Sequence, residues 1–401
     1  MTLTLIDEKQ EGYICDMVIG DKIQSILNYI YVFLFVTYTF FSILIMFSAF
    51  NIQSPEMVVL YKFVKIIIIC SLVLIVLFRP YKIQTMFLMM VVLSIALYGY
   101  YINSQERMLI FLLFAFASKN INPRKVLRLD FFVRVLSFVM VIFLYALGVL
   151  QKVYFFRPTG EWRDSLGFAH PNYGGIVLLT IVIEWVLLRN KKINLFESLS
   201  ILGISYVFYK FFLDRTDWIL TILLVLLVIV SNSNLIYKSM NHLISTILPL
   251  VGWALSILSL IVLFFVTPGS RLYLELNAVL SSRLDIFQFY YKLSGLKILP
   301  QNITTYFKDS TFAGMDNSAI YIALFDGMIL LFVFCIVEQF IGKNLKNYAI
   351  NVKLAFLILM LTGLTEALMI YPFINMFVVY YGQYESKVMT NNLLPTGDRK
   401  I

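Results

Sequence analysis

The chain has 401 residues, of which 60% are hydrophobic and only 14% are charged, whereas a soluble domain carries about 25% charged residues. This composition excludes an ordinary soluble enzyme. We attribute the net charge of +9 to basic residues that set the orientation of the chain in the membrane, because such residues gather on the cytoplasmic side of membrane proteins. It is not taken as a sign of a nucleic-acid partner. The three cysteines form no CxxC pair and no disulfide framework.

Apolar runs of about 17–25 residues recur along the chain and must be helical in a bilayer, where unpaired backbone groups are destabilising. The expected fold is an all-α polytopic membrane protein, one integral membrane domain over residues 1–401 with about twelve spans. In chain order, the spans are expected at 26–49, 57–78, 84–102, 107–118, 131–150, 173–189, 197–212, 216–232, 243–267, 317–340, 351–371 and 372–384.

The distribution of Lys and Arg between these spans favours a cytoplasmic N-terminus and a cytoplasmic C-terminus. The tails 1–25 and 385–401 then lie in the cytoplasm. The outer face receives the segment 151–172 and one large extracytoplasmic loop, 268–316.

Several arginines depart from this charge rule and fall on the outer side. They are Arg157 and Arg163 in the first outer segment, Arg215 in a tight turn, and Arg283 in the large loop. Each arginine can pair with a lipid phosphate or with a nearby carboxylate. Their joint placement on one face nevertheless favours an anion-binding site.

Nucleotide and metal sites are not expected. The sequence contains neither GxxxxGK[ST] nor GxGxxG, so the energy for any reaction must arrive in the substrate. No His, Asp and Glu cluster has metal-ligand spacing. We therefore expect no cofactor and no metal.

The segment RDSLGFAHPNYGG, which starts at Arg163, is the richest in reactive side chains. Pro171 and Asn172 fit a turn that caps the next helix. His170 has two interpretations, because it can belong to that turn or act as a general base near neutral pH. A neighbouring guanidinium can hold a phosphate through two parallel hydrogen bonds.

This segment resembles the R-x-S-x-G-F-x-H-P-N signature of bacterial oligosaccharide repeat-unit polymerases, the Wzy-type enzymes of capsule, exopolysaccharide and O-antigen synthesis. Four later segments resemble further family elements in the same order: FLDRTDWILTILL, LSSRLDIFQFYYK, MDNSAIYIALFDGMIL and LTGLTEALMIYPFINMFVV. The chain departs from the family pattern at Asp214, where Ser is common, and at Asp326, which is usually not acidic.

The resemblance implies a GT-C-like, metal-independent, inverting glycosyltransferase in the bacterial cytoplasmic membrane, related to O-antigen ligases, with its active site facing outside. Such enzymes transfer a growing glycan from undecaprenyl pyrophosphate to the non-reducing end of the next lipid-linked repeat unit. A chain-length co-polymerase and a flippase are the implied partners besides the lipid bilayer. The implied catalytic residues are His170, Arg163, Arg215 and Arg283, and the implied substrate-binding residues are Arg157, Asn172, Asp316, Asn317, Tyr321 and Glu366.

Two alternatives remain at the level of sequence. A ligase that transfers a finished glycan to another acceptor would use the same arginines and histidine. A flippase or other transporter for lipid-linked sugars would instead use acids near the middle of the membrane, for which Glu184 and Asp326 are the candidates.

Overall fold

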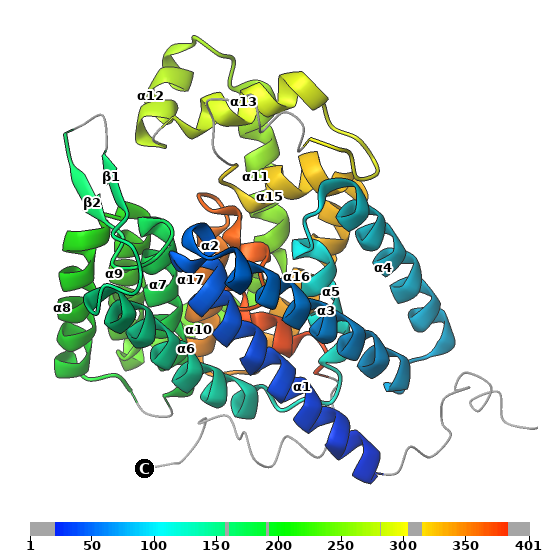
Figure 1. Cartoon of the computed structure of the whole chain (residues 1–401). Coiled ribbons are helices and arrows are strands. Elements are labelled where there is room, and N and C mark those ends of the chain that lie inside the picture. The colour runs from blue at the N-terminus through cyan, green and yellow to red at the C-terminus, as the bar shows by residue number, and fades with distance from the viewer. Residues whose placement is uncertain (1–20, 157–159, 190–191, 281, 304–314, 384–401) are drawn as a thin grey trace, which may run out of the picture.

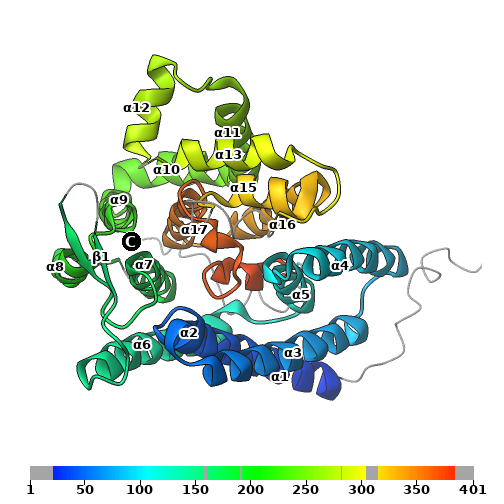
Figure 2. The same cartoon turned by 45° about the horizontal axis from the view of Figure 1, so that its top comes forward.

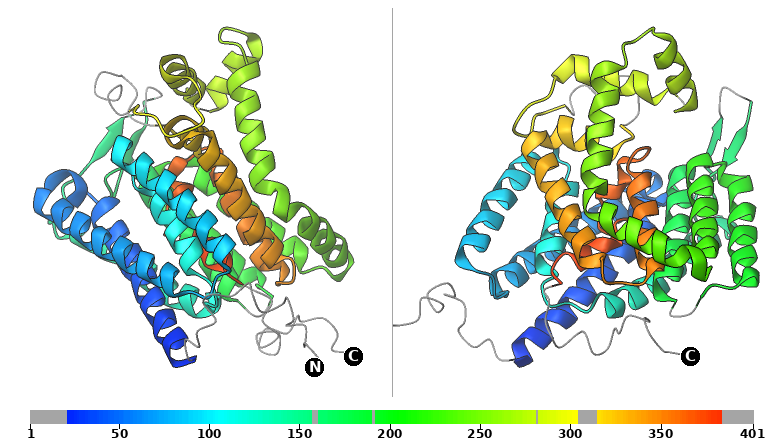
Figure 3. Two further views of the ribbon diagram at one scale, coloured as in Figure 1. Left: turned by 90° about the vertical axis from the view of Figure 1, so that its right-hand side faces the viewer. Right: turned by 180° about the vertical axis from the view of Figure 1, so that it is seen from behind.

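The computed structural model describes residues 21–156, 160–189, 192–280, 282–303 and 315–383 (Figure 1). Arg157, most of both expected tails and part of the expected 268–316 loop lie outside these ranges. A short antiparallel hairpin, β1 (Tyr154–Phe156) and β2 (Trp162–Asp164), stands at one end of a helical bundle. Helices α12 and α13 cover the same end (Figure 3), which we call the hairpin end.

The first half of the chain supplies helices that alternate between the two ends of the bundle. They are α1 (Asp21–Phe41) with the π-helical turn η1 (Ser42–Met46), α2 (Phe50–Gln53), α3 (Pro55–Phe78), α4 (Ile83–Asn103), α5 (Arg107–Ala117) and α6 (Pro123–Ala146).

The second half continues the bundle and adds the cover of the hairpin end. Its elements are α7 (Pro171–Leu188), α8 (Leu195–Phe212), α9 (Arg215–Ser231), α10 (Asn234–Ile247), η2 (Leu248–Leu250), α11 (Val251–Phe265), α12 (Arg271–Val279), α13 (Arg283–Ser294), α15 (Ser318–Tyr321), η3 (Ile322–Asp326), α16 (Gly327–Leu345), α17 (Ile350–Thr362), η4 (Ala367–Ile370) and η5 (Met376–Tyr380).

Membrane insertion explains both the length and the composition of these helices. Within the described residues, eight helical stretches are long and apolar enough to cross a bilayer, and the apolar helices α5 and α17 are shorter. The chain is therefore an all-α, multi-pass membrane protein. Helix α6 begins at Pro123 rather than near 131, because Asn122 accepts a hydrogen bond from the Arg124 N–H and Pro123 suits a first helical position.

Peripheral and central helices differ in how much of their surface the protein covers. Only 22% of the most apolar window of α3 and 17% of that of α8 are buried, against 67% for α7 and 72% for the stretch containing α16. Large apolar side chains such as Phe63 and Phe196 are exposed on the peripheral helices. These surfaces are suited to lipid contact.

The segment expected to form a last span, 372–384, is not a helix, and the prediction of a helix there was wrong. It forms short 3₁₀ turns in the centre of the bundle (Figure 2), and every residue from Ala367 to Tyr380 is buried. Pro372 has no N–H to donate. Irregular backbone is tolerated at membrane depth where surrounding protein covers it.

Buried polar side chains fasten this irregular segment, which we call the crossing segment (residues 366–382). Arg134 on α6 donates to the Phe373 carbonyl oxygen and to Thr180 Oγ1, and it pairs with Asp130 and Glu184. At the far end, Asn344 Nδ2 donates to the carbonyl oxygens of Tyr380 and Tyr381 at 2.7 and 3.1 Å. These contacts replace hydrogen bonds that a helix would have made internally.

Candidate functional site

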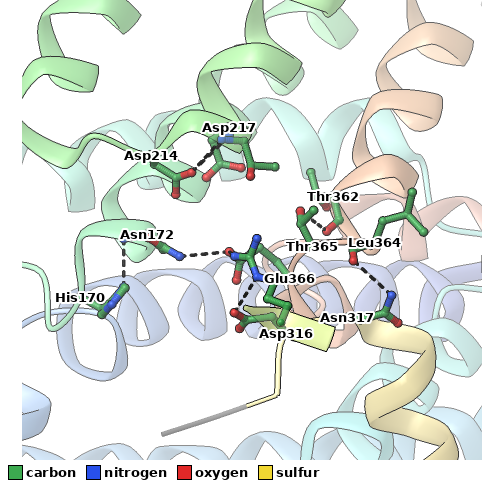
Figure 4. Close-up of polar contacts among 12 residues, drawn as sticks. His170, Asn172, Asp214, Asp217, Asp316, Asn317, Thr362, Leu364, Thr365 and Glu366 are labelled. Atoms are coloured by element: carbon green, nitrogen blue, oxygen red, sulfur yellow. Dashed lines mark hydrogen bonds and ion pairs between the residues drawn. The ribbon is translucent and has the colours of Figure 1, made fainter. Parts of the chain in front are cut away.

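Side chains from four separate segments meet at the hairpin end, where α7, α9 and α13 begin and the crossing segment follows α17 (Figure 4). They form what we call the site cluster, consisting of Arg163, Asn172, Arg283, Asp316 and Glu366.

Arg163 ties the hairpin to two helices. Its Nε donates to the Phe212 carbonyl oxygen at the end of α8, and its Nη2 donates to Asn172 Oδ1, both at 2.6 Å. The residue is only 6% exposed. Because two of its donors serve the protein itself, Arg163 fixes the start of α7 as well as adding positive charge.

Glu366 joins the two arginine-bearing halves of the cluster. Its Oε1 accepts hydrogen bonds from Asn172 Nδ2 and from Arg283 Nη2, each at 3.1 Å. Arg283 Nε also donates to Asp316 Oδ2 at 2.9 Å. A continuous chain of contacts therefore runs from Arg163 to Asp316.

Exposure within the site cluster is greatest at Asp316. The Asp316 side chain is 36% exposed and that of Arg283 is 13% exposed, whereas that of Glu366 is 5% exposed. Burial disfavours the Arg283 cation, yet Glu366 and Asp316 more than offset this and raise the pKa of Arg283 above its usual range. Arg283 therefore stays charged and lies next to a partly exposed carboxylate.

His170 lies beside the site cluster and caps α7. Its Nδ1 accepts the backbone N–H of Asn172 at 3.1 Å, and the ring packs edge-on against Phe155 of β1, with centroids 4.5 Å apart. An accepting Nδ1 places the proton of the neutral ring on Nε2. In this geometry His170 is better suited to donate a hydrogen bond from Nε2 than to accept a proton as a base.

Arg215 is oriented away from the site cluster. It forms an ion pair with Glu161 at 3.2 Å, next to strand β2, and its side chain is 58% exposed. Of the arginines expected on the outer face, Arg163 and Arg283 contact the Asn172–Glu366 pair, whereas Arg215 pairs with Glu161 at the surface.

Asn317 and Tyr321 lie on the inner side of the same region and serve mainly to position it. Asn317 Oδ1 caps α15 by accepting the Ile320 N–H at 2.9 Å, and its Nδ2 donates to Ser259 Oγ and to the Leu364 carbonyl oxygen. Tyr321 stacks on Phe325 with ring centroids 4.5 Å apart.

Sequence reasoning missed three charged residues near this end. Arg107 lies over the rings of Tyr321 and Tyr371, 4.6 and 4.9 Å from their centroids. Arg107 could have been identified from the sequence, because it lies at the start of an expected span, as Arg215 does. Asp214 and Asp217 are also buried here. The only feature of the sequence that pointed to them was that Asp214 stands where the family pattern commonly has Ser.

Asp214 combines a cap with a buried charge. Its Oδ1 accepts the backbone N–H groups of Thr216 and Asp217 at 3.2 and 3.4 Å, which starts α9. Burial raises the pKa of Asp214 above its usual range, although the positive charges of Arg163 and Arg283 act in the opposite direction.

Among the described residues, no group of three or more His, Cys, Asp or Glu side chains is arranged to hold a metal ion. Positive charge at this end comes from Arg163 and Arg283 of the site cluster and from Arg107 beside it. No family model matches the chain, and no curated protein or solved structure is significantly similar to it.

Proposed function

We propose that this protein polymerises lipid-linked oligosaccharide repeat units at the outer face of a bacterial cytoplasmic membrane. The growing glycan leaves undecaprenyl pyrophosphate and joins the non-reducing end of the next lipid-linked unit. The observation that carries this proposal is the contact chain from Arg163 through Asn172 and Glu366 to Arg283 and Asp316. These residues come from the separate segments that resemble the polymerase family.

The leaving pyrophosphate is the part of the reaction that needs fixed cations. Negative charge builds on it as the glycosidic bond breaks, and preorganised donors stabilise that charge. Arg283 presents Nε and Nη2 toward Asp316 and Glu366. A pyrophosphate that replaces Asp316 at Nε and Glu366 at Nη2 would receive a two-pronged contact from this guanidinium.

The same exchange supplies a base. Asp316 loses its cationic partner when the pyrophosphate binds, and a carboxylate without a cation accepts a proton more readily. The acceptor hydroxyl oxygen attacks the anomeric carbon, the bond to pyrophosphate breaks with its electron pair on the phosphate oxygen, and the proton passes to Asp316. His170 orients the sugar by hydrogen bonding, since its Nδ1 is engaged in the α7 cap.

Reconstitution tests the proposal directly. Full-length protein in lipid nanodiscs would receive purified undecaprenyl-pyrophosphate-linked repeat units, with EDTA and without nucleotide. We expect a ladder of lipid-linked oligomers. Transfer that requires an added acceptor lipid would indicate a ligase, and movement of unmodified substrate across the membrane would indicate a flippase. Either result would contradict the polymerase.

Sidedness is tested separately by cysteine labelling of intact cells. A cysteine replacing Glu275 on the exposed side of α12 should react with an impermeant reagent added outside. A cysteine replacing the exposed Lys125 near the start of α6 should not react. The opposite pattern would place the site cluster in the cytoplasm and remove the polymerase mechanism.

A further inference from the structure

A small cavity lies between α7, α8 and α9, beside the site cluster. It has a volume of about 20 Å³, and its polar walls come from Ser205 and Tyr209 of α8, Asp217 and Thr221 of α9, and Asp214 before α9. About 10–15 Å³ measured in this way is enough for one water molecule. The cavity therefore has room for one small occupant.

The groups lining this cavity include buried oxygens without partners among the described residues. These oxygens are Oδ2 of Asp214, both carboxylate oxygens of Asp217, and Oγ of Ser205. Asp214 is 6% exposed, Asp217 4% and Ser205 3%. Buried polar atoms are nearly always paired, and the Ser205 hydroxyl, on a separate helix, indicates an occupant independently of the two acids.

Gly175 shows that the carboxylates converge on one point. A Cβ atom at this position of α7 would lie 3.0 Å from Asp214 Oδ2 and 3.0 Å from Asp217 Oδ2. The glycine leaves that space open, and the two oxygens approach the same place from the start of α9. Two carboxylates held this closely repel one another unless a positive charge is shared between them.

We propose that this cavity binds one dehydrated monovalent metal cation, with sodium as the expected ion. Its lining residues carry oxygens that can bind such an ion, among them Asp214 Oδ2, Asp217 Oδ1 and Oδ2, Ser205 Oγ and Thr221 Oγ1. A metal cation satisfies these acceptors and removes the repulsion between the acids, as a proton shared between the two carboxyl groups also would.

The donor set distinguishes sodium from the common divalent ions. Calcium takes about six to eight oxygen ligands, and magnesium usually keeps several of its waters. The cavity has space for one occupant, which leaves no room for the additional ligands or waters that these divalent ions take. The nearby guanidinium of Arg283 already supplies positive charge to the region, which also favours a singly charged ion.

The test is thermal unfolding of the full-length protein in detergent, followed by tryptophan fluorescence while sodium chloride replaces choline chloride at constant ionic strength. We expect the melting temperature to rise with sodium and to saturate, because a ligand that binds only the folded state stabilises it. The measurement needs no glycan substrate, so it tests the sodium site independently of the polymerase proposal.

Variants assign the effect to the cavity. Asp217→Asn should abolish the sodium response, and Ser205→Ala, which removes one neutral ligand, should raise the half-maximal sodium concentration about tenfold. Glu275→Gln, an exposed carboxylate-to-amide change on α12, is the matched control and should respond like the wild type. If Asp217→Asn does not fold, the Ser205→Ala titration decides alone.

Three outcomes would overturn the sodium site. Equal stabilisation by choline would show an ionic-strength effect. Stabilisation by calcium but not by sodium would exclude a monovalent ion. Stabilisation by lowered pH with no response to sodium would show that the two carboxyl groups share a proton instead.

Discussion

Two arginines of this protein each lie between two carboxylates, and their surroundings differ. Arg134 pairs with Asp130 and Glu184 inside the bundle, and all three side chains are 0% exposed. Arg283 pairs with Glu366 and with Asp316, whose side chain is 36% exposed. The ion pairs of Arg134 are inaccessible to solvent. The Arg283–Asp316 pair is partly exposed, so a ligand can reach it.

The comparison separates structural support from ligand binding. The Arg134 group also donates to the Phe373 carbonyl oxygen, so it stabilises the crossing segment that carries Glu366 to the hairpin end. A buried ion pair stabilises poorly by itself but is strongly destabilising when one partner is removed. We therefore expect the largest stability effects at Arg134 and the largest activity effects at Arg283.

Arg134→Met should produce the largest change in stability. It leaves the carboxylates of Asp130 and Glu184 without a cation, which destabilises a fold by about 3–5 kcal/mol. Thermal unfolding in detergent measures the loss. The triple variant Arg134→Met, Asp130→Asn, Glu184→Gln removes the uncompensated charges and should recover much of the stability. A single variant as stable as the wild type would show that this group does not support the crossing segment.

Arg283→Lys should reduce polymer formation strongly while changing stability little. Lysine keeps the charge but loses the planar fork that two phosphate oxygens need, and loss of one preorganised donor lowers turnover by about 10²–10³-fold. The matched control is Arg271→Lys on α12, whose side chain is 93% exposed. Equal activity of the two variants would contradict phosphate binding by Arg283.

His170→Ala should have a moderate effect, because it removes the side chain that caps α7. Loss of a cap lowers stability by about 1 kcal/mol, seen as a lower melting temperature. His170→Asn supplies another good cap and should restore stability. If His170 only positions the sugar, the Asn variant also keeps the wild-type dependence of turnover on pH. If turnover of the His170→Asn variant no longer changes near neutral pH as wild-type turnover does, His170 acts as the base.

Arg215→Lys should have the smallest effect on stability. Its ion pair with Glu161 is largely exposed, and such pairs contribute about 0–1 kcal/mol. We expect a melting temperature close to that of the wild type at ordinary salt concentration. A large drop would mean that Arg215 supports the hairpin more strongly than its exposure indicates. Turnover of the same variant tests the catalytic role that the family resemblance implies.

Hydropathy predicted much of the helical frame. The expected spans 57–78, 84–102 and 107–118 match α3, α4 and α5 within two residues at each end. This works because a helix at membrane depth is surrounded by lipid or by apolar protein and is therefore apolar along most of its length. Helices α12 and α13, which lie within the expected loop 268–316, are short and amphipathic and gave no comparable signal.

The motifs that resemble the polymerase family contain all five residues of the site cluster. They do not show which of these residues contact one another. The segments around Arg163, Arg283 and Glu366 were recognisable one by one from their resemblance to family motifs. That Glu366 lies between Asn172 and Arg283, and that Arg215 pairs with Glu161 instead, depends on how α7, α9 and α13 pack at the hairpin end.

The sequence by itself determined that this protein is a multi-pass membrane protein and which polar segments interrupt its apolar runs, because solvation by lipid acts on every residue of a span independently of its neighbours. Tertiary structure alone decided that residues 372–384 would cross the bundle without forming a helix. Hydropathy measures only whether a segment avoids water. It does not distinguish an apolar segment that contacts lipid from one that is buried in protein. Packed helices and the buried groups at Arg134 and Asn344 satisfy that backbone, and only the folded bundle brings them there.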